Sequence, residues 1–318
     1  MRLFVSEFLS GGGLCGENLP PDLLRDADCM SNALMDDLRR IDGLELITTR
    51  DVRLGSIPES VAVIRTADDP WVIWAECLRS CDAAWITAPE SGGILLALRH
   101  LADVCGCRFI GSDAEAIRIT TSKTATMQYF SRAGIAGIET AAVSGSPPHG
   151  EHGWIVKRDD GAGCENTWYF SDQADIIDWR SACADAELYI VQPRINGRHA
   201  SLSVLYSDNG CRVLACNEQD IRFENGRVHA KEPYVDKLHE RIADLVSFAE
   251  SIGRAMPGLR GFVGIDFMYT DTGPVLVEIN PRLTTSYAGL HAILDYNPAE
   301  RILQSFGYLT ESTDPVTL

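Results

Sequence analysis

The 318-residue sequence lacks several features that would place it in a familiar class. No apolar run approaches the roughly 18 residues that a membrane-spanning helix needs. The first residues break into Gly11-Gly12-Gly13 without the apolar core of a signal peptide. Basic residues are scarce, since 28 Lys and Arg stand against 45 Asp and Glu, and the net charge is −17. Because a nucleic-acid-binding surface needs a basic surplus, we expect no nucleic-acid binding. The missing apolar run and signal peptide lead us to expect a cytoplasmic protein that binds no membrane.

Paired metal-binding cysteines are also missing. The ten cysteines are dispersed without a CxxC pair, so we expect mostly reduced thiols and no structural zinc site. His149 and His152 are the other candidate metal ligands, although a solvated loop is the simpler interpretation of their Pro- and Gly-rich segment. No Ser–His–Asp or Cys–His pattern suggests a nucleophilic side chain.

Strand and helix patterns alternate over the first 115 residues. Short apolar runs predict strands, and apolar residues at steps of three or four predict helices. The predicted strands span 3–8, 44–48, 61–65, 83–87 and 108–111, and the predicted helices span 23–41, 71–81 and 94–104. This order is typical of an α/β domain with a doubly wound parallel sheet.

The remaining chain is a mixture of strands and helices, which makes the whole an α/β (α+β) protein. Ser122 is the predicted N-cap of a helix, and Asn225-Gly226 predicts a hairpin turn. Further strands are predicted at 154–157, 167–170, 188–192, 200–206, 212–216, 261–269 and 275–280, and further helices at 172–184, 236–253 and 298–306. We expect three units, covering residues 1–115, 116–191 and 192–318.

Residues 261–282 form the most informative segment. A hairpin centred on Thr272 places Asp266 opposite Glu278, and the period of two places Asn280 on the same face. Directly opposed carboxylates repel each other unless a cation lies between them. Two carboxylates and an amide oxygen suit Mg²⁺ or Mn²⁺, with substrate phosphates completing the shell. The alternative is that one acid caps the hairpin and faces water.

Two lysines suggest a phosphate site. Lys157 ends an apolar strand and is followed by Gly161 and Gly163, whose backbone N–H groups can approach an anion closely. Lys123 begins a helix, where anions are favoured. The loop is neither GxGxxG nor a Walker A sequence. An ordinary hairpin turn and a solvated lysine are the alternative interpretations.

Two further segments offer polar groups. The strand ending at Gln192-Pro193 leaves backbone groups free, because proline cannot donate to a sheet, and these groups together with the Gln192 side chain suit an adenine edge. The alternative is an ordinary edge-strand end. Asn217 and Gln219 alternate onto one face and are either substrate contacts or turn residues.

In this combination the sequence resembles the ATP-grasp superfamily, in order from about residue 118 to 290. The resemblance implies ATP phosphate contacts from Lys123 and Lys157, with residues 161–164, including Gly161 and Gly163, as a lid. It implies adenine contacts from Gln192, Arg194 and Ile195, and Mg²⁺ ligands in Asp266, Glu278 and Asn280. Arg282 would neutralise the transferred phosphoryl group, as a catalytic residue beside Lys157. His199 stands where the family often has a ribose-binding glutamate.

Within the superfamily, the chain is similar to tyramine–glutamate ligases of methanofuran-type cofactor biosynthesis. The opening Ser-Gly-Gly-Gly, the short chain and Asn217-Glu218-Gln219 carry this resemblance. It implies an ATP-dependent carboxylate–amine ligase that joins glutamate to tyramine or a tyrosine-like amine through an acylphosphate. Substrate contacts would come from Gly12, Asn217 and Gln219.

Three alternatives stay open. One is a D-alanine–D-alanine-like dipeptide ligase, and another is a non-catalytic nucleotide-binding regulatory protein. The third, a Rossmann-type oxidoreductase, is disfavoured because the loop after the first strand is not GxGxxG. We expect small-molecule carboxylate and amine partners and, as the default for a soluble enzyme, a homodimer.

Overall fold

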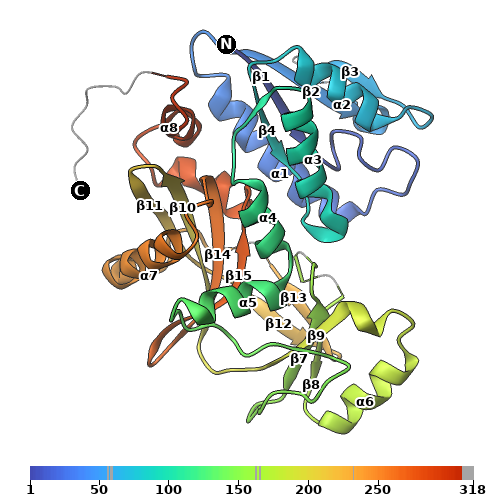
Figure 1. Ribbon diagram of the computed structural model, residues 1–318, viewed down its shortest axis with the longest axis vertical. Helices are drawn as coiled ribbons and strands as arrows, with labels where there is room; N and C mark the ends of the chain where they lie inside the picture. Colours follow the sequence, from blue (N-terminus) through green and yellow to red (C-terminus); the bar gives the residue numbers. More distant parts are fainter. Residues whose placement is uncertain (56, 58–59, 162, 165, 232, 310–318) are drawn as a thin grey trace.

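The computed structural model describes residues 1–55, 57, 60–161, 163–164, 166–231 and 233–309 (Figure 1). Its N-terminal part holds a five-stranded parallel sheet in the order β3-β2-β1-β4-β5. The strands are β1 (Arg2–Glu7), β2 (Glu45–Asp51), β3 (Ser60–Ile64), β4 (Ala83–Thr87) and β5 (Arg108–Phe109), and the helices are α1 (Pro21–Leu38), α2 (Pro70–Arg79) and α3 (Ile94–Val104). These elements confirm the pattern predicted for the first 115 residues.

Alternation along β1 explains why this sheet is covered on both faces. Leu3 and Val5 pack with α1 residues such as Leu34, while Phe4 packs with Trp74 of α2 and with α3. Successive side chains of a strand point to opposite faces, so an apolar strand buries both. The predicted doubly wound arrangement is therefore confirmed.

A helix that the sequence patterns did not predict leads out of this domain. It is α4 (Ala114–Thr121), capped by Asp113, and it runs directly into α5 (Lys123–Arg132). Ser122 separates the two helices in an extended conformation, and its side chain accepts a hydrogen bond from the Ala125 N–H. The predicted N-cap role of Ser122 is confirmed.

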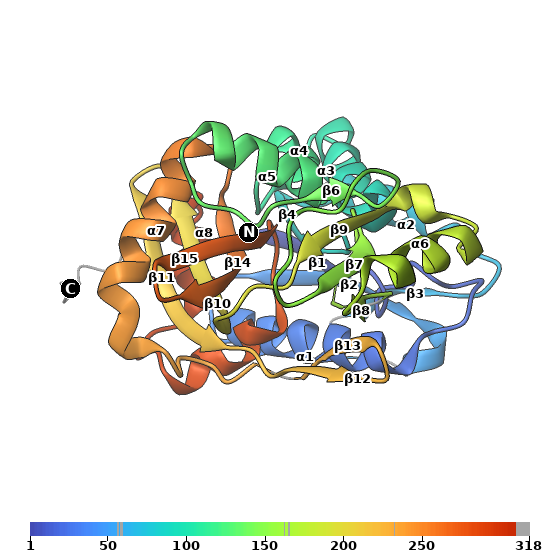
Figure 2. The same ribbon diagram turned by 90° about the horizontal axis from the view of Figure 1, so that it is seen from below.

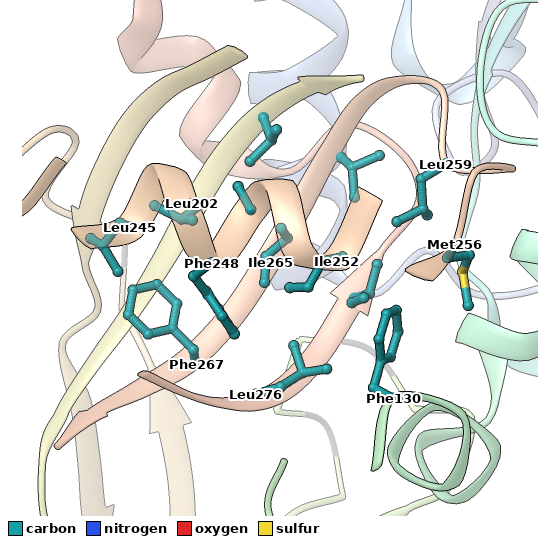
Figure 3. Packing of buried hydrophobic residues seen from close by; sticks show 14 of the residues in the cluster. Phe130, Leu202, Leu245, Phe248, Ile252, Met256, Leu259, Ile265, Phe267 and Leu276 are labelled. Atoms are coloured by element: carbon teal, nitrogen blue, oxygen red, sulfur yellow. The ribbon is translucent and has the colours of Figure 1, made fainter. Parts of the chain in front are cut away.

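The second sheet is antiparallel and contains the predicted carboxylate hairpin. Its order is β11-β10-β14-β15, with β10 (Arg198–Ser207), β11 (Gly210–Glu218), β14 (Gly261–Thr270) and β15 (Gly273–Asn280). Helix α7 (Ile242–Ala255) lies over its inner face, where Phe248 and Ile252 meet Leu202, Ile265 and Phe267 (Figure 3). Each such large apolar side chain contributes about 1.5–3 kcal/mol when fully buried, so this core holds the hairpin firmly.

The helix predicted over residues 236–253 begins later than expected. Asp236 has a φ of 55°, which a right-handed helix does not allow, and residues His239–Arg241 form a 3-10 turn before α7. The apolar period of the sequence extended one turn too far because Leu238 is buried in the same core as α7 although it precedes the helix.

The third sheet has six strands in the order β12-β13-β8-β7-β9-β6. They are β6 (Ala141–Ala142), β7 (Trp154–Arg158), β8 (Trp168–Phe170), β9 (Tyr189–Pro193), β12 (Ile221–Glu224) and β13 (Arg227–Ala230), and α6 (Gln173–Ala182) packs against them. Asn225 and Gly226, both at positive φ, join β12 to β13, so the predicted hairpin turn is confirmed.

The sheets interleave along the chain. β12 and β13 follow the second sheet's β11 in sequence but pair with the third sheet, while α5 precedes the third sheet but packs into the second sheet's core (Figures 1 and 2). The division into residues 116–191 and 192–318 stays a prediction. Strands β12 and β13 of the later range pair with the sheet of the earlier range, and α5 of the earlier range packs against the sheet of the later range. The chain closes with the 3-10 helix Thr285–Ala292 and α8 (Pro298–Ser305), which pack on α1.

Among the helices of the described residues, none combines the length and the apolar character that crossing a bilayer requires.

Candidate active site

The carboxylate hairpin has the register that its sequence predicted. Asp266 lies directly opposite Glu278, and Gly264 lies opposite Asn280. The turn is not centred on Thr272, however, because Thr270 pairs with Gly273. A β-bulge between the turn and the Asp266–Glu278 pair restores the predicted register. Asp266 and Phe267 are adjacent, but their partners Glu278 and Leu276 are two residues apart.

Two side-chain amides donate hydrogen bonds to Asp266. Gln219 donates from Nε2 to Oδ1 at 3.0 Å, and Asn280 donates from Nδ2 to Oδ2 at 3.2 Å. Burial and the neighbouring charge of Glu278 nevertheless raise the pKa of Asp266 to about 7. Two carboxylates and the Asn280 amide oxygen are a donor set that Mg²⁺ prefers.

A polar row crosses this sheet from edge to edge. The directly paired positions are Asn217, Ser201, Asp266 and Glu278. Asn217 is fully buried: its Nδ2 donates to Ser201 and Ser203, and its Oδ1 accepts from the Asp236 N–H. These contacts make Asn217 a buried anchor for the segment at Asp236. Its predicted substrate contact stays a prediction, whereas Gln219 reaches Asp266 itself.

The two predicted lysines lie beside the same carboxylates. The buried Lys123 places Nζ 3.3 Å from Oε2 of Glu278 and also donates to the Gly161 carbonyl. Burial lowers the pKa of Lys157, the carboxylate of Glu278 opposes this, and the charge of Lys123 lowers the pKa further. Lysines that are far apart in the sequence therefore share one electrostatic environment with the hairpin.

Asp159 explains how the lysines come together. Its Oδ1 accepts from the Thr124 N–H at 2.8 Å, its Oδ2 accepts from the Ser122 hydroxyl, and its backbone oxygen accepts from the Lys123 N–H. The end of β7 is therefore bonded to the first turn of α5. Asp159 was not predicted as a site residue, because its position two residues after Lys157 does not show that its carboxylate reaches α5.

The glycine loop after β7 faces both the lysines and the N-terminal domain. Gly163 is exposed with a φ of 66°, while Ala162 lies outside the described residues. Asp160 accepts from the Gly92 N–H at 2.9 Å. Burial raises the pKa of the Cys164 thiol to about 11, and its titration also responds to Lys157. The predicted lid role of this loop stays a prediction.

The predicted adenine edge is more occupied by protein contacts than expected. Gln192 is buried and donates from Nε2 to the Thr140 hydroxyl at 2.9 Å. The Arg194 guanidinium lies 4.7 Å from the centre of the Phe223 ring, and Ile195 is partly buried against the core of the second sheet. The nucleotide contacts predicted for Gln192, Arg194 and Ile195 stay predictions.

His199 shares the face of Asp266. It pairs with Met268 across β10 and β14, two residues from the Ser201–Asp266 pair. Burial lowers the pKa of His199, and the charges of Arg194 and Lys157 lower it further. The imidazole is therefore neutral near pH 7. Its predicted contact with a ribose stays a prediction.

Gly12 has a packing reason to be glycine. It is buried with a φ of 99°, and a Cβ there would lie 2.7 Å from Ile64. The same loop instead offers Glu7, which ends β1, accepts from the Ser10 N–H and lies close enough to Arg282 for their charges to interact. The predicted substrate contact of Gly12 stays a prediction, and Glu7 is a site residue that sequence reasoning missed.

Arg282 joins the hairpin to the parallel sheet. Its Nη2 donates to Oε2 of Glu90 at 2.9 Å, and its Nη1 donates to the Leu283 carbonyl. Burial opposes the charge of Arg282, but Glu90, with smaller contributions from Glu278 and Glu7, raises its pKa above the ordinary value. Sequence reasoning missed Glu90, although ligands of open parallel sheets bind at the carboxyl ends of the strands, where Glu7 and Glu90 lie.

The other metal candidates do not come together. His152 Nε2 lies 2.8 Å from Asn196 Nδ2, and His149 is exposed beside Glu151. Within the described part of the chain, no three His, Cys, Asp or Glu side chains are grouped to hold a metal ion. None of the ten cysteines, all of which lie among the described residues, forms a disulfide.

Known proteins are similar to this chain in sequence and in structure. The tyramine–L-glutamate ligase of Methanocaldococcus jannaschii is 26% identical over 212 residues, or 66% of this chain, and the chain spans 58% of that protein's length. An ATP-grasp superfamily protein of Archaeoglobus fulgidus has a similar structure, with a TM-score of 0.74, 22% identity, and coverage of 96% of this chain and 88% of that one.

An ADP complex of N5-carboxyaminoimidazole synthetase from Staphylococcus aureus also has a similar fold. Its TM-score is 0.70 at 14% identity, and the match covers 98% of this chain and 78% of that one. Residues 44–117 match the pre-ATP-grasp domain, and residues 120–286, more than half of the chain, match the ATP-grasp domain. The predicted fold is confirmed, and the chain belongs to the ATP-grasp family.

Proposed function

We propose that this chain is an ATP-dependent ligase that joins a carboxylate to an amine, with glutamate as the carboxylate and tyramine or a tyrosine-like amine as the acceptor. The observation that carries the proposal is the convergence of Asp266, Glu278, Lys123, Lys157 and Arg282 around one edge of the second sheet. The similar ligases of known substrate support the choice of glutamate and tyramine.

The charges divide into two groups with different tasks. Lys123 and Lys157 bind phosphate oxygens of ATP, and Arg282 stabilises the phosphoryl group as it moves. Asp266, Glu278 and Asn280 hold Mg²⁺ or Mn²⁺, which when bound neutralises negative charge on the ATP phosphates. Positioning and electrostatics are sufficient for phosphoryl transfer, so the site requires no nucleophilic side chain.

The reaction then has two steps. The substrate carboxylate attacks the γ-phosphorus of ATP, releasing ADP and forming an acylphosphate. The amine attacks the acyl carbon, phosphate leaves, and an amide bond is formed with loss of a proton. Water must be excluded while the acylphosphate exists. The glycine loop, held toward the N-terminal domain by the Asp160–Gly92 bond, is suited to that task.

The test is ADP release from Mg-ATP and glutamate, with tyramine, tyrosine or alanine as amine, and with mass spectrometry of the products. We expect ADP formation that depends on both substrates and a product mass equal to glutamate plus tyramine minus water. Turnover with D-alanine alone would replace this proposal with a dipeptide ligase. Tight Mg-ATP binding without turnover on a broad panel would favour a regulatory nucleotide-binding protein.

A further inference from the structure

Residues Glu90 to Gly93, the second part of the link between β4 and α3, contact two parts of the candidate site. The Glu90 carboxylate accepts from Arg282 at 2.9 Å, and the Gly92 N–H donates to Asp160 at 2.9 Å. Gly92 and Gly93 both have positive φ, which gives the segment its sharp turn after β4. The Asp160 bond anchors this turn, so Glu90 projects from a fixed backbone.

Burial makes the Glu90–Arg282 pair unusual. Their side chains are only 6% and 12% exposed. Oε1 of Glu90 and Nε of Arg282 are also buried without a hydrogen-bond partner among the described residues. Leaving such atoms unpaired costs stability, and a buried ion pair stabilises a fold less than well-packed apolar residues can. Folding alone therefore gives little reason to keep these two charges.

The orientation of Arg282 supplies a reason. Its two terminal nitrogens are directed by Glu90 and by the Leu283 carbonyl, which fixes the plane of the guanidinium. Arg282 lies two residues beyond the end of β15, the hairpin strand that carries Glu278. A planar donor held in one orientation loses little freedom when it meets an anion.

We propose that Glu90 is a positioning residue that holds Arg282 toward the phosphoryl group transferred from ATP. This inference rests on the proposed function. Glu90 acts through Arg282 and does not itself need to contact a substrate. The N-terminal domain thereby contributes to phosphoryl transfer at a site whose proposed phosphate- and metal-binding groups come from helix α5 and from the other two sheets.

The test compares Glu90→Gln with Glu90→Asp, Arg282→Lys and the double variant Glu90→Gln/Arg282→Lys. Glu115→Gln is the matched control, since Glu115 forms an exposed pair with Arg118 on α4. We expect Glu90→Gln to lower kcat about 10- to 100-fold and to keep the Mg-ATP affinity within about threefold. Glu90→Asp should recover part of kcat, and Glu115→Gln should behave as wild type.

The double variant separates positioning from a purely structural role. If Glu90 works through Arg282, Glu90→Gln costs less than about twofold in the Arg282→Lys background. The same loss in both backgrounds, or an unchanged kcat in Glu90→Gln, overturns the inference. A wild-type chain that forms no amide would refute the proposed ligase instead. In that case the test of Glu90 is the binding of aluminium fluoride to the Mg-ADP complex of the protein. We expect this binding to weaken about tenfold in Glu90→Gln. Unchanged binding would also overturn the inference.

Discussion

Two regions bring acids to Arg282, and they do so in opposite electrostatic states. In the carboxylate hairpin, Asp266 and Glu278 face each other, and the pKa of Asp266 is raised to about 7. At the edge of the parallel sheet, Glu90 is paired with Arg282 itself. In the hairpin, two opposed acids share their surroundings with Lys123 and Lys157, whereas Glu90 forms a single ion pair with Arg282. The hairpin is therefore a site of several interacting charges, and Glu90 belongs to one closed pair.

The largest expected effect comes from removing one hairpin charge. Glu278→Gln or Asp266→Asn should reduce turnover by about 10²–10³-fold or more, because a charge-stabilising group at a reacting phosphate contributes on that scale. The fold should persist, as measured by circular dichroism. The measurement is ADP and amide formation over a range of Mg²⁺ concentrations. Full activity of either variant at limiting Mg²⁺ would contradict the metal assignment.

Lys157→Met should separate function from stability. We expect Mg-ATP affinity to fall about tenfold, a loss of about 1.4 kcal/mol. Since the folded state lowers the pKa of Lys157, burial of this lysine opposes folding fully below the folded pKa, and the penalty then declines and is lost only as pH approaches the ordinary value of 10.5. At neutral pH the variant should therefore have a higher Tm. Calorimetric titration and thermal unfolding measure the two effects.

The same comparison requires a control that retains both lysines of the candidate site, Lys123 and Lys157. Lys231→Met removes an exposed lysine from the segment after β13, and it should leave both the Mg-ATP affinity and the Tm close to the wild-type values. An unchanged nucleotide affinity in Lys157→Met would reject the phosphate-binding role of Lys157.

Asn217→Ala tests whether the polar row is structural at its far end. Losing the buried hydrogen bonds to Ser201, Ser203 and the Asp236 N–H should lower the free energy of unfolding by about 2 kcal/mol. Urea unfolding measures this change. A variant of wild-type stability with a strongly raised KM for the amine would instead make Asn217 a substrate contact.

The last expected effect is a pH dependence of the metal-free protein. The folded pKa of Asp266, about 7, lies above its ordinary value of 3.8, so the folded state binds the proton more tightly. The contribution of Asp266 to stability is present below about pH 4 and is lost as pH rises to 7, by at most about 1.4 kcal/mol per pH unit. Asp266→Asn should flatten this slope in urea unfolding, and a slope of equal size in the variant would assign it elsewhere.

Local sequence was sufficient for the hairpin because its partners are neighbours along the chain. Apolar alternation sets which side chains face the core, and a short turn limits the register. Even there, the position of the turn was wrong, and the bulge near Val277 that restored the Asp266–Glu278 pair has no clear sequence signal. The Ser122 cap and the Asn225-Gly226 turn were predicted for the same local reasons.

Contacts between distant segments were harder to predict. Glu7 and Glu90 are separated by several elements, and only the parallel pairing of β1 with β4 brings their loops to one edge. Asp159 holds the start of α5 by accepting a hydrogen bond from the Thr124 N–H, and these two residues are 35 positions apart in the sequence. Helix α4 was missed because it is short, and helix propensity over a single short element is a weak signal.

The sequence by itself determined the alternating N-terminal domain, the strand faces that carry Asp266 and Glu278, and the positions of the two lysines, because each depends on spacing within one strand or helix. Only the tertiary structure decided that Lys123 meets Glu278, that Asn217 is a buried anchor, and that Arg282 is held by Glu90. The physical reason is that side-chain charges interact over a few ångströms in space, whereas sequence patterns specify only which face of an element those side chains occupy.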